Sequence, residues 1–137
     1  MIGDFAFKDT ALTTLYIPNC LYIGQSAFEN CNKLMSMTLL NKGDICINNN
    51  SFSNCSSLFY IENLDNISKI DDYSFSNCYN FPNTLYMPKC KSIGSYSFLN
   101  CYKLSALVAN NCSFVNYNAF CGTPLFDSKP LNSTIYE

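Results

Sequence analysis

The sequence predicts a solenoid of short stacked coils, because two columns of apolar residues recur along the chain in the same register. One column has steps of 21, 24, 23, 23 and 22 residues and consists of Ile2, Ile23, Ile47, Ile70, Ile93 and Val115. The other has identical steps and consists of Phe7, Phe28, Phe52, Phe75, Phe98 and Phe120. Two independent columns that keep register over six copies indicate a repeat architecture, in which each unit buries its apolar face only by stacking on its neighbours.

A third column supplies the leucine expected of such a unit. It follows each Phe by five or six residues and consists of Leu12, Leu34, Leu58, Phe81, Leu104 and Leu125. A fixed period of about 20–29 residues with leucine at set places predicts a leucine-rich solenoid. We expect six coils that start near residues 2, 23, 47, 70, 93 and 115 and fill residues 1–125, with 126–137 as a C-terminal cap or tail.

One short strand per coil is predicted from the residues that follow the third column. Apolar and polar residues alternate there, which indicates a strand with one buried face. The inward positions are Leu15 and Ile17, Met37 and Leu39, Ile61, Leu85 and Met87, and Leu107 and Ala109. These strands should stack as a parallel sheet on the concave face, with short strands or turns and little helix elsewhere. Each Ile-Gly segment is expected to be a turn or an extended piece, and Pro82 adds one residue before its strand, which predicts a bulge.

The repeat unit resembles the BspA-like leucine-rich repeat. The second copy matches that pattern at Ile23, Gly24, Ala27, Phe28, Cys31, Leu34, Met37 and Leu39, and the fifth copy matches it at Ile93, Gly94, Phe98, Cys101, Leu104 and Leu107. The resemblance covers roughly residues 2–125. It implies an architecture that binds other molecules, and it is similar to repeats in surface proteins of anaerobic bacteria and parasitic protists, some of which resemble adhesins.

Composition excludes several functional classes. Only 13% of the 137 residues are charged, the net charge is −2, and the chain has no His and no Arg. Eight scattered Lys residues make no basic stripe, so nucleic acid is not an expected partner. No apolar run approaches the roughly 20 residues that cross a bilayer, so we expect no membrane insertion. The absence of a recognisable signal peptide favours a cytoplasmic location, with the cell surface as the alternative.

The nine cysteines form two columns and one outlier. Cys31, Cys55, Cys78 and Cys101 lie three residues after the Phe, and Cys20, Cys90 and Cys112 lie just past the strand, with Cys46 as a possible fourth member. A zinc site and a disulfide set are both conceivable, but the sequence has no C-x-x-C pair and no His. We therefore interpret both columns as small buried hydrophobes. Cys121 departs from the pattern and is expected to be the most exposed thiol.

Polar columns have a similar structural interpretation. Asn30, Asn54, Asn77 and Asn100 precede the cysteines and predict a ladder of amides that satisfies turn backbone groups. A glycan interpretation exists because Asn54, Asn66, Asn111 and Asn132 begin sequons. The pair Asp71 and Asp72 is interpreted as a solvated bend rather than as an acid–base or calcium site. Ser is plentiful but has no His to act as its base, so no catalytic residue, metal site or cofactor is expected.

The outward side of the predicted strands is the candidate binding surface. Alternation assigns to it Thr14, Tyr16, Ser36, Thr38, Tyr60, Glu62, Tyr86, Ala106 and Val108. Tyrosine is a rigid amphipathic contact residue that is enriched at interfaces, although it is also common on strands. We expect Tyr16, Tyr60 and Tyr86 to lie along one stripe. The sequence thus predicts a non-enzymatic protein-interaction module. Two alternatives stay open: a structural subunit whose ends are covered by neighbours, and an adhesin-like surface protein.

Overall fold

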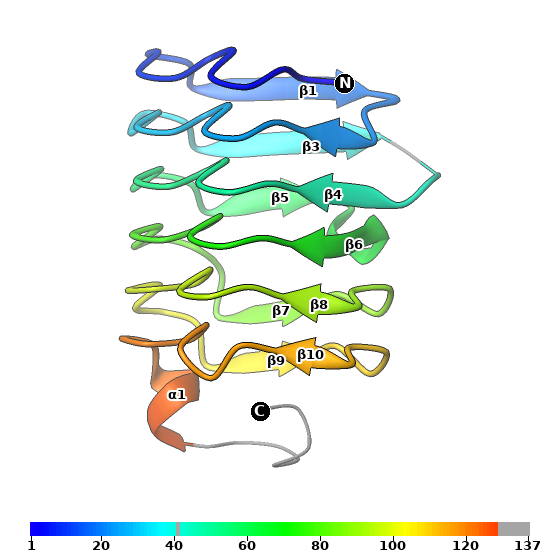
Figure 1. Ribbon diagram of the computed structural model, residues 1–137. Coiled ribbons are helices and arrows are strands. Elements are labelled where there is room, and N and C mark those ends of the chain that lie inside the picture. Colours follow the sequence, from blue (N-terminus) through cyan, green and yellow to red (C-terminus); the bar gives the residue numbers. More distant parts are fainter. Residues whose placement is uncertain (41, 129–137) are drawn as a thin grey trace.

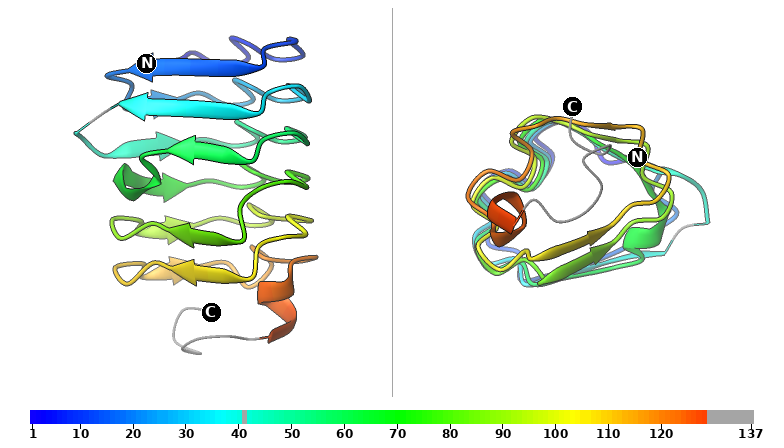
Figure 2. Two further views of the ribbon diagram at one scale, coloured as in Figure 1. Left: turned by 180° about the vertical axis from the view of Figure 1, so that it is seen from behind. Right: turned by 90° about the horizontal axis from the view of Figure 1, so that it is seen from below.

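A computed structural model describes residues 1–40 and 42–128 of the chain, and it confirms the predicted solenoid. The coils lie one above another, and each paired strand runs parallel to its neighbours (Figure 1). Viewed along the stack, the successive coils overlay one another closely (Figure 2). The helical content of the described residues is small: the 3-10 turn η1 (Leu64–Asn66) and the helix α1 (Pro124–Ser128).

The predicted strands form one side of the solenoid. The strands β1 (Thr14–Pro18), β3 (Ser36–Leu40) and β5 (Tyr60–Glu62) make a three-stranded sheet. The strands β7 (Thr84–Tyr86) and β9 (Ala106–Val108) make a two-stranded sheet. Their inward residues are buried in every coil except the first, where they are half-buried.

The sheet is interrupted at the place where a bulge was expected. Strands β5 and β7 belong to different sheets, and Pro82 lies just before β7. Proline has no N–H to donate, and the extra residue shifts the approach to the strand, so the ladder stops instead of bulging. The register shift that the structure does contain lies elsewhere, between Ile45 and Cys46.

A second sheet runs along the Ile-Gly segments, for which the sequence predicted only a turn or an extended piece. Its five strands lie in the order β10-β8-β6-β4-β2. They are β2 (Tyr22–Ile23), β4 (Ile45–Ile47), β6 (Ile67–Ile70), β8 (Ser92–Ile93) and β10 (Phe114–Val115). Each strand is very short and is held in place by its hydrogen bonds to the strands of the neighbouring coils. The four coils that start near residues 23, 47, 70 and 93 therefore have two strands rather than one, whereas the first coil has β1 and an isolated bridge at Ile2, and the last has β10.

The core consists of the predicted ladders. Five pairs of neighbouring rings in the Phe column stack almost parallel, with centroids 5.1–5.5 Å apart. That spacing slightly exceeds the separation of about 4.8 Å between strands, so each ring packs on the next without leaving its register. Phe81 leans against this stack at 4.9 Å from Phe75. The Ile, Leu and Cys columns complete the core around it.

The Asn column forms a side-chain ladder. Asn54 Nδ2 donates to Asn30 Oδ1 at 2.8 Å, and Asn77 Nδ2 donates to Asn54 Oδ1 at 2.8 Å. Asp9 ends the ladder at one end as an acceptor, and Asn100 continues it at the other. The sequence predicts that these amides bond to turn backbone groups. In the structure they bond to one another instead. Every ladder residue has φ between 60° and 62°, a left-handed conformation that Asn tolerates well.

The two ends of the solenoid differ. In the first coil Phe7 is 36% exposed, whereas Phe28 in the next coil is fully buried. At the other end α1 lies against the last coil (Figures 1 and 2), and its Leu125 is fully buried. Thr123 fixes the start of α1, since its hydroxyl accepts the Phe126 N–H at 3.1 Å. Of the predicted cap or tail, residues 129–137 lie outside the described residues.

Candidate functional site

The predicted binding residues lie on one side of the solenoid, on β1, β3, β5, β7 and β9. We call this surface the strand face, and it consists of Thr14, Tyr16, Ser36, Thr38, Tyr60, Glu62, Tyr86, Ala106 and Val108. Each of these side chains is exposed or half-buried, as the alternation predicted. Thr84 on β7 is a further exposed member that the sequence prediction omitted.

The tyrosines dominate this face because they stand well out from it. Tyr16 is 64% exposed, Tyr60 49% and Tyr86 59%. Their backbones are fixed by strand pairing, so only the side-chain torsions are free. A rigid aromatic side chain loses little entropy when it binds, which makes it a favourable anchor for a partner.

The register arranges the face in two rows rather than one stripe. In the sheet of β1, β3 and β5, one row of paired residues consists of Thr14, Ser36 and Tyr60. The next row consists of Tyr16, Thr38 and Glu62. In the sheet of β7 and β9, Tyr86 pairs with Val108 in one row, and Thr84 pairs with Ala106 in the other. Tyr16 and Tyr86 therefore hold one position of the repeat and Tyr60 another, so the expected single tyrosine stripe is wrong.

A shallow hollow lies beside the face, at the start of the strands, and sequence reasoning missed it. Its volume is about 410 Å³, and it is lined by Met35, Ser57, Phe59, Asn80 and Lys103. Met35 is 42% exposed and Phe59 is 55% exposed, which is unusual for apolar residues directly before buried strands. The signal was available, because both residues follow the third-column Leu in their coils. The alternation that predicts the strands begins one residue later and therefore does not include them.

Polar contacts hold the rim of this hollow in place. Lys103 Nζ donates to Asn80 Oδ1 at 3.0 Å, and Asn80 Nδ2 donates to the Ser56 carbonyl at 2.8 Å. Tyr79 and Tyr102 stack beside them with ring centroids 5.1 Å apart. The hollow is thus an apolar floor with a cationic and amide rim, next to the Tyr60 row.

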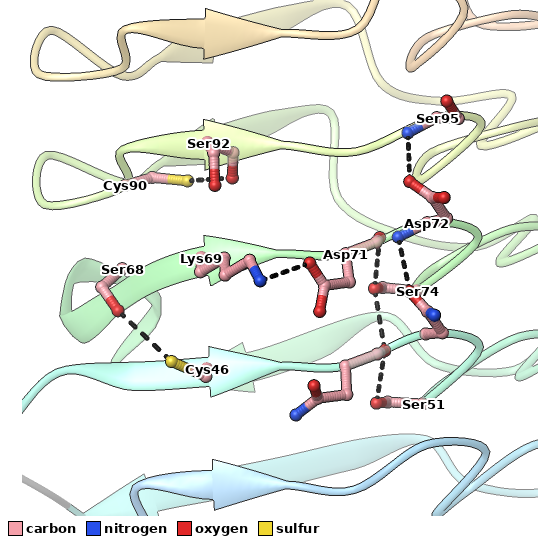
Figure 3. Close-up of polar contacts among 12 residues, drawn as sticks. Cys46, Ser51, Ser68, Lys69, Asp71, Asp72, Ser74, Cys90, Ser92 and Ser95 are labelled. Carbon is pink, nitrogen blue, oxygen red and sulfur yellow. Dashed lines mark hydrogen bonds and ion pairs between the residues drawn. The ribbon is translucent and has the colours of Figure 1, made fainter.

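The acidic pair on the opposite sheet has a structural role. Asp71 forms an ion pair with Lys69 at 3.0 Å, and Asp72 Oδ1 accepts the Ser95 N–H at 2.8 Å (Figure 3). The Asp72 N–H in turn donates to Asn49 Oδ1 at 3.1 Å. Asp72 therefore links its coil to the coils on either side, whereas the Asp71 ion pair lies within one coil. No group of three or more His, Cys, Asp or Glu residues that could hold a metal ion is found in residues 1–40 and 42–128.

The inner cysteine column is buried, as predicted. Cys31, Cys55, Cys78 and Cys101 are fully buried, and the thiols donate to the Phe carbonyls of the preceding coil at 3.0–3.2 Å. Burial raises the pKa of Cys55 and Cys78 well above the ordinary value, and it raises the pKa of Cys101 to about 12. These thiols are inert core residues rather than ligands or nucleophiles.

The outer cysteines differ from this pattern. Cys20, Cys90 and Cys112 each donate to the carbonyl two residues further on. Cys46 does not share that role: it lies in β4, 3.8 Å from the Ser68 hydroxyl (Figure 3). Cys121 is half-buried, but so are Cys46 and Cys112.

The sequons coincide with structural amides. Asn54 belongs to the ladder, and Asn111 Nδ2 donates to the Pro88 carbonyl at 2.7 Å. Asn66 Oδ1 accepts from Lys89 Nζ at 2.9 Å. Asn132 lies outside the described residues.

Comparison with known proteins identifies the family to which this repeat belongs. The family model for the BspA type leucine rich repeat region matches residues 1–126 in six copies. The structure is similar to that of a leucine rich cell surface protein from Faecalibacterium prausnitzii A2-165, with a TM-score of 0.77 and 29% identity. That match covers 88% of this chain and 34% of the other.

A second solved structure, a leucine-rich repeat protein from Bacteroides ovatus ATCC 8483, has the same fold. Its TM-score is 0.70 at 20% identity, and the match covers 98% of this chain and 44% of the other. The chain thus spans less than half the length of either protein. A search of curated proteins found no significant match. In the described part of the chain, no helix has the length and hydropathy needed to cross a membrane.

Proposed function

This chain belongs to the BspA-type leucine-rich repeat family, and on that premise we propose that it is a non-enzymatic module that binds a partner protein through the strand face. The observation that carries the proposal is the exposure of Tyr16, Tyr60 and Tyr86 on paired, rigid strands. Repeat proteins of this kind offer extended surfaces held at fixed spacing, which suits recognition of another folded surface.

The chemistry of the face suits a protein partner. Hydroxyls of Thr14, Ser36 and Thr38 lie between the tyrosines, so the surface combines aromatic anchors with adaptable hydrogen-bonding groups. Glu62 is the single charged residue of the predicted face. A nearly neutral surface gives little electrostatic steering, so affinity should depend weakly on salt.

The hollow beside the face extends the proposed interface. Met35 and Phe59 directly precede the strand residues Ser36 and Tyr60, so an apolar side chain of a partner can reach both surfaces at once. Apolar anchors that fill a pocket next to exposed aromatics are typical of binding hot spots.

The experiment compares capture of proteins from the native cells by the wild-type chain and by two triple variants. One variant carries Tyr16→Ser, Tyr60→Ser and Tyr86→Ser on the strand face. The matched control carries Tyr22→Ser, Tyr73→Ser and Tyr117→Ser, three exposed tyrosines outside that face.

We expect the face variant to lose its partner and the control to keep it. A loss of about 1–2 kcal/mol per anchor weakens binding by about two to four orders of magnitude in total. Circular dichroism must show that both variants remain folded. Capture that survives in the face variant and disappears in the control would contradict the proposal.

A second candidate function is that of a structural subunit, in which a neighbouring molecule packs against apolar residues exposed at one end of the solenoid. In the first coil Phe5 is 54% exposed and Phe7 is 36% exposed. We propose that in such an assembly a second copy of the chain covers this end. Light scattering of the purified chain tests it, since a monomer at high concentration would argue against this role.

A further inference from the structure

Two thiols in neighbouring coils occupy the same turn with the same backbone geometry. Cys90 follows β7 and precedes β8, and Cys112 follows β9 and precedes β10. The Cys90 N–H donates to the Met87 carbonyl at 3.2 Å, and the Cys112 N–H donates to the Ala109 carbonyl at 3.0 Å. Both residues therefore sit at the third position beyond the carbonyl that closes their turn.

The register brings these two thiols side by side. Ser92 pairs with Phe114 in the second sheet, so the residues two places earlier, Cys90 and Cys112, face each other across one coil step. Asn111 Nδ2 donates to the Pro88 carbonyl at 2.7 Å and ties the two turns together. The step of about 4.8 Å between parallel chains lies within the Cα separation that a disulfide spans, about 4.4–6.8 Å.

The two side chains take the same local orientation. Each thiol donates to the carbonyl two residues further on, Cys90 at 3.4 Å and Cys112 at 3.3 Å. Cys112 is half-buried, whereas Cys90 is buried. Cys112 is thus partly accessible to a reagent in solution, whereas Cys90 is shielded from solvent.

The remaining outer cysteine lacks this arrangement. Tyr22 pairs with Cys46, so the place in the next coil that corresponds to Cys20 is held by Asp44. The inner column brings thiols together as well, but those thiols are fully buried. Adjacency and access coincide only at Cys90 and Cys112 among the described residues.

We propose that Cys90 and Cys112 are a redox pair that small-molecule disulfides oxidise to a reversible disulfide across neighbouring coils. The Cys112 thiolate attacks one sulfur of the reagent, which forms a mixed disulfide and releases one thiolate. Cys90 then gives up its proton and attacks the Cys112 sulfur, which forms the Cys90–Cys112 bond and releases the second thiolate. Two protein thiols are oxidised, one reagent disulfide is reduced to two thiols, and the two protein protons end on the released thiolates.

The electrostatics of the pair support these roles. A hydrogen bond from Cys90 lowers the pKa of Cys112 to about 7, and the same bond raises the pKa of Cys90. Because the thiolate is the nucleophile, the lowered pKa favours Cys112 as the attacking thiol.

The test treats the reduced full chain with oxidised glutathione at neutral pH and maps the products by peptide mass spectrometry. The wild type should yield a peptide pair joined through Cys90 and Cys112, with loss of two hydrogen atoms, which dithiothreitol reverses. The C90S variant should stop at a mixed disulfide on Cys112. The matched control, C121S, removes a half-buried thiol whose matching position in the adjoining coil is Leu99 rather than a cysteine, and it should behave as the wild type does.

The wild-type result decides the matter even if a variant fails to fold. A stable glutathione adduct on Cys112 that never resolves would overturn the pairing, because Cys90 would then be out of reach. Faster modification of Cys121 than of Cys112, or no oxidation of either member of the pair, would overturn the assigned roles.

Discussion

Replacement of Asn54 separates the two properties that the Asn ladder combines. The side chain of Asn54 donates to Asn30 at 2.8 Å and accepts from Asn77 at 2.8 Å. Its backbone has φ of 62°, which favours Asn and Gly over other residues. Asn54→Ala removes both advantages, whereas Asn54→Gly removes only the hydrogen bonds.

The magnitudes follow from these contacts. Two half-buried hydrogen bonds contribute about 1 kcal/mol each, so both variants should lose about 2 kcal/mol of unfolding free energy. Ala pays about 1 kcal/mol more than Asn in the left-handed region, so Asn54→Ala should lose about 3 kcal/mol in total. Gly122 holds the matching place at the end of the column, with φ of 77°, which supports Gly as the conformationally neutral replacement.

Urea denaturation followed by circular dichroism measures the difference in unfolding free energy between each variant and the wild type, and a thermal melt measures the difference in melting temperature. For a chain of 137 residues, losses of 3 and 2 kcal/mol correspond to melting temperatures lower by about 10 °C and 7 °C. Equal losses in the two variants would refute the conformational part of the reasoning. A loss below about 0.5 kcal/mol in Asn54→Gly would refute the contribution of the ladder.

Three further predictions concern the core and the coil contacts. Ser97 Oγ is buried without a hydrogen-bond partner among the described residues, and Ala27 and Ala119 hold the equivalent place, so Ser97→Ala should raise the unfolding free energy measured in urea by about 1 kcal/mol. Ser74→Ala is its matched control and should lower stability by about 1–2 kcal/mol, because its hydroxyl donates to Asp71 and Asn48 carbonyls; a gain in this control would contradict the argument. Gly94→Ala should cost about 1–3 kcal/mol in thermal unfolding, since the new Cβ would lie 2.7 Å from Asp72 N, and an unchanged melting temperature would show that the coils can separate at no cost. Burial raises the pKa of Cys55, Cys78 and Cys101 above the ordinary 9.0, so their stabilising effect is complete below pH 9 and is lost as pH rises towards 12. Between these pH values the unfolding free energy should fall by about 4 kcal/mol per pH unit for the three thiols together. Cys55→Ala should make that slope shallower by about 1.4 kcal/mol per pH unit.

The core columns could be predicted from the sequence because each is a repeated local choice. Phe28 and Phe52 stack at 5.1 Å, as two residues with a constant step in a solenoid must. Cys55 and Asn54 likewise followed from their place beside the Phe. Six copies of the Phe position and four each of the Cys and Asn positions gave a signal that a single copy would not give.

The second sheet and the interruption of the first could not be predicted in the same way. Ser92 and Ile93 form a strand of two residues, too short to show any alternation, and it exists only because β6 and β10 lie on either side. The break between β5 and β7 depends on how one added residue, Pro82, changes the approach of a whole coil.

The binding surface was predicted as a set of residues but not as an arrangement. Alternation places Tyr16 and Tyr60 outward, and the structure agrees. Their assignment to different rows follows from strand pairing, which alternation within one strand does not specify. The hollow at Met35 and Phe59 arises between coils, so it needed the stacked structure to become visible.

Photo-crosslinking in the native cells tests most directly whether the strand face carries the function. A photoreactive residue at Thr38, at the centre of the face, is compared with one at Lys69, on the outward side of the second sheet. The account predicts a protein crosslinked through position 38 and none through position 69. A partner crosslinked through position 69 and not through position 38 would contradict it.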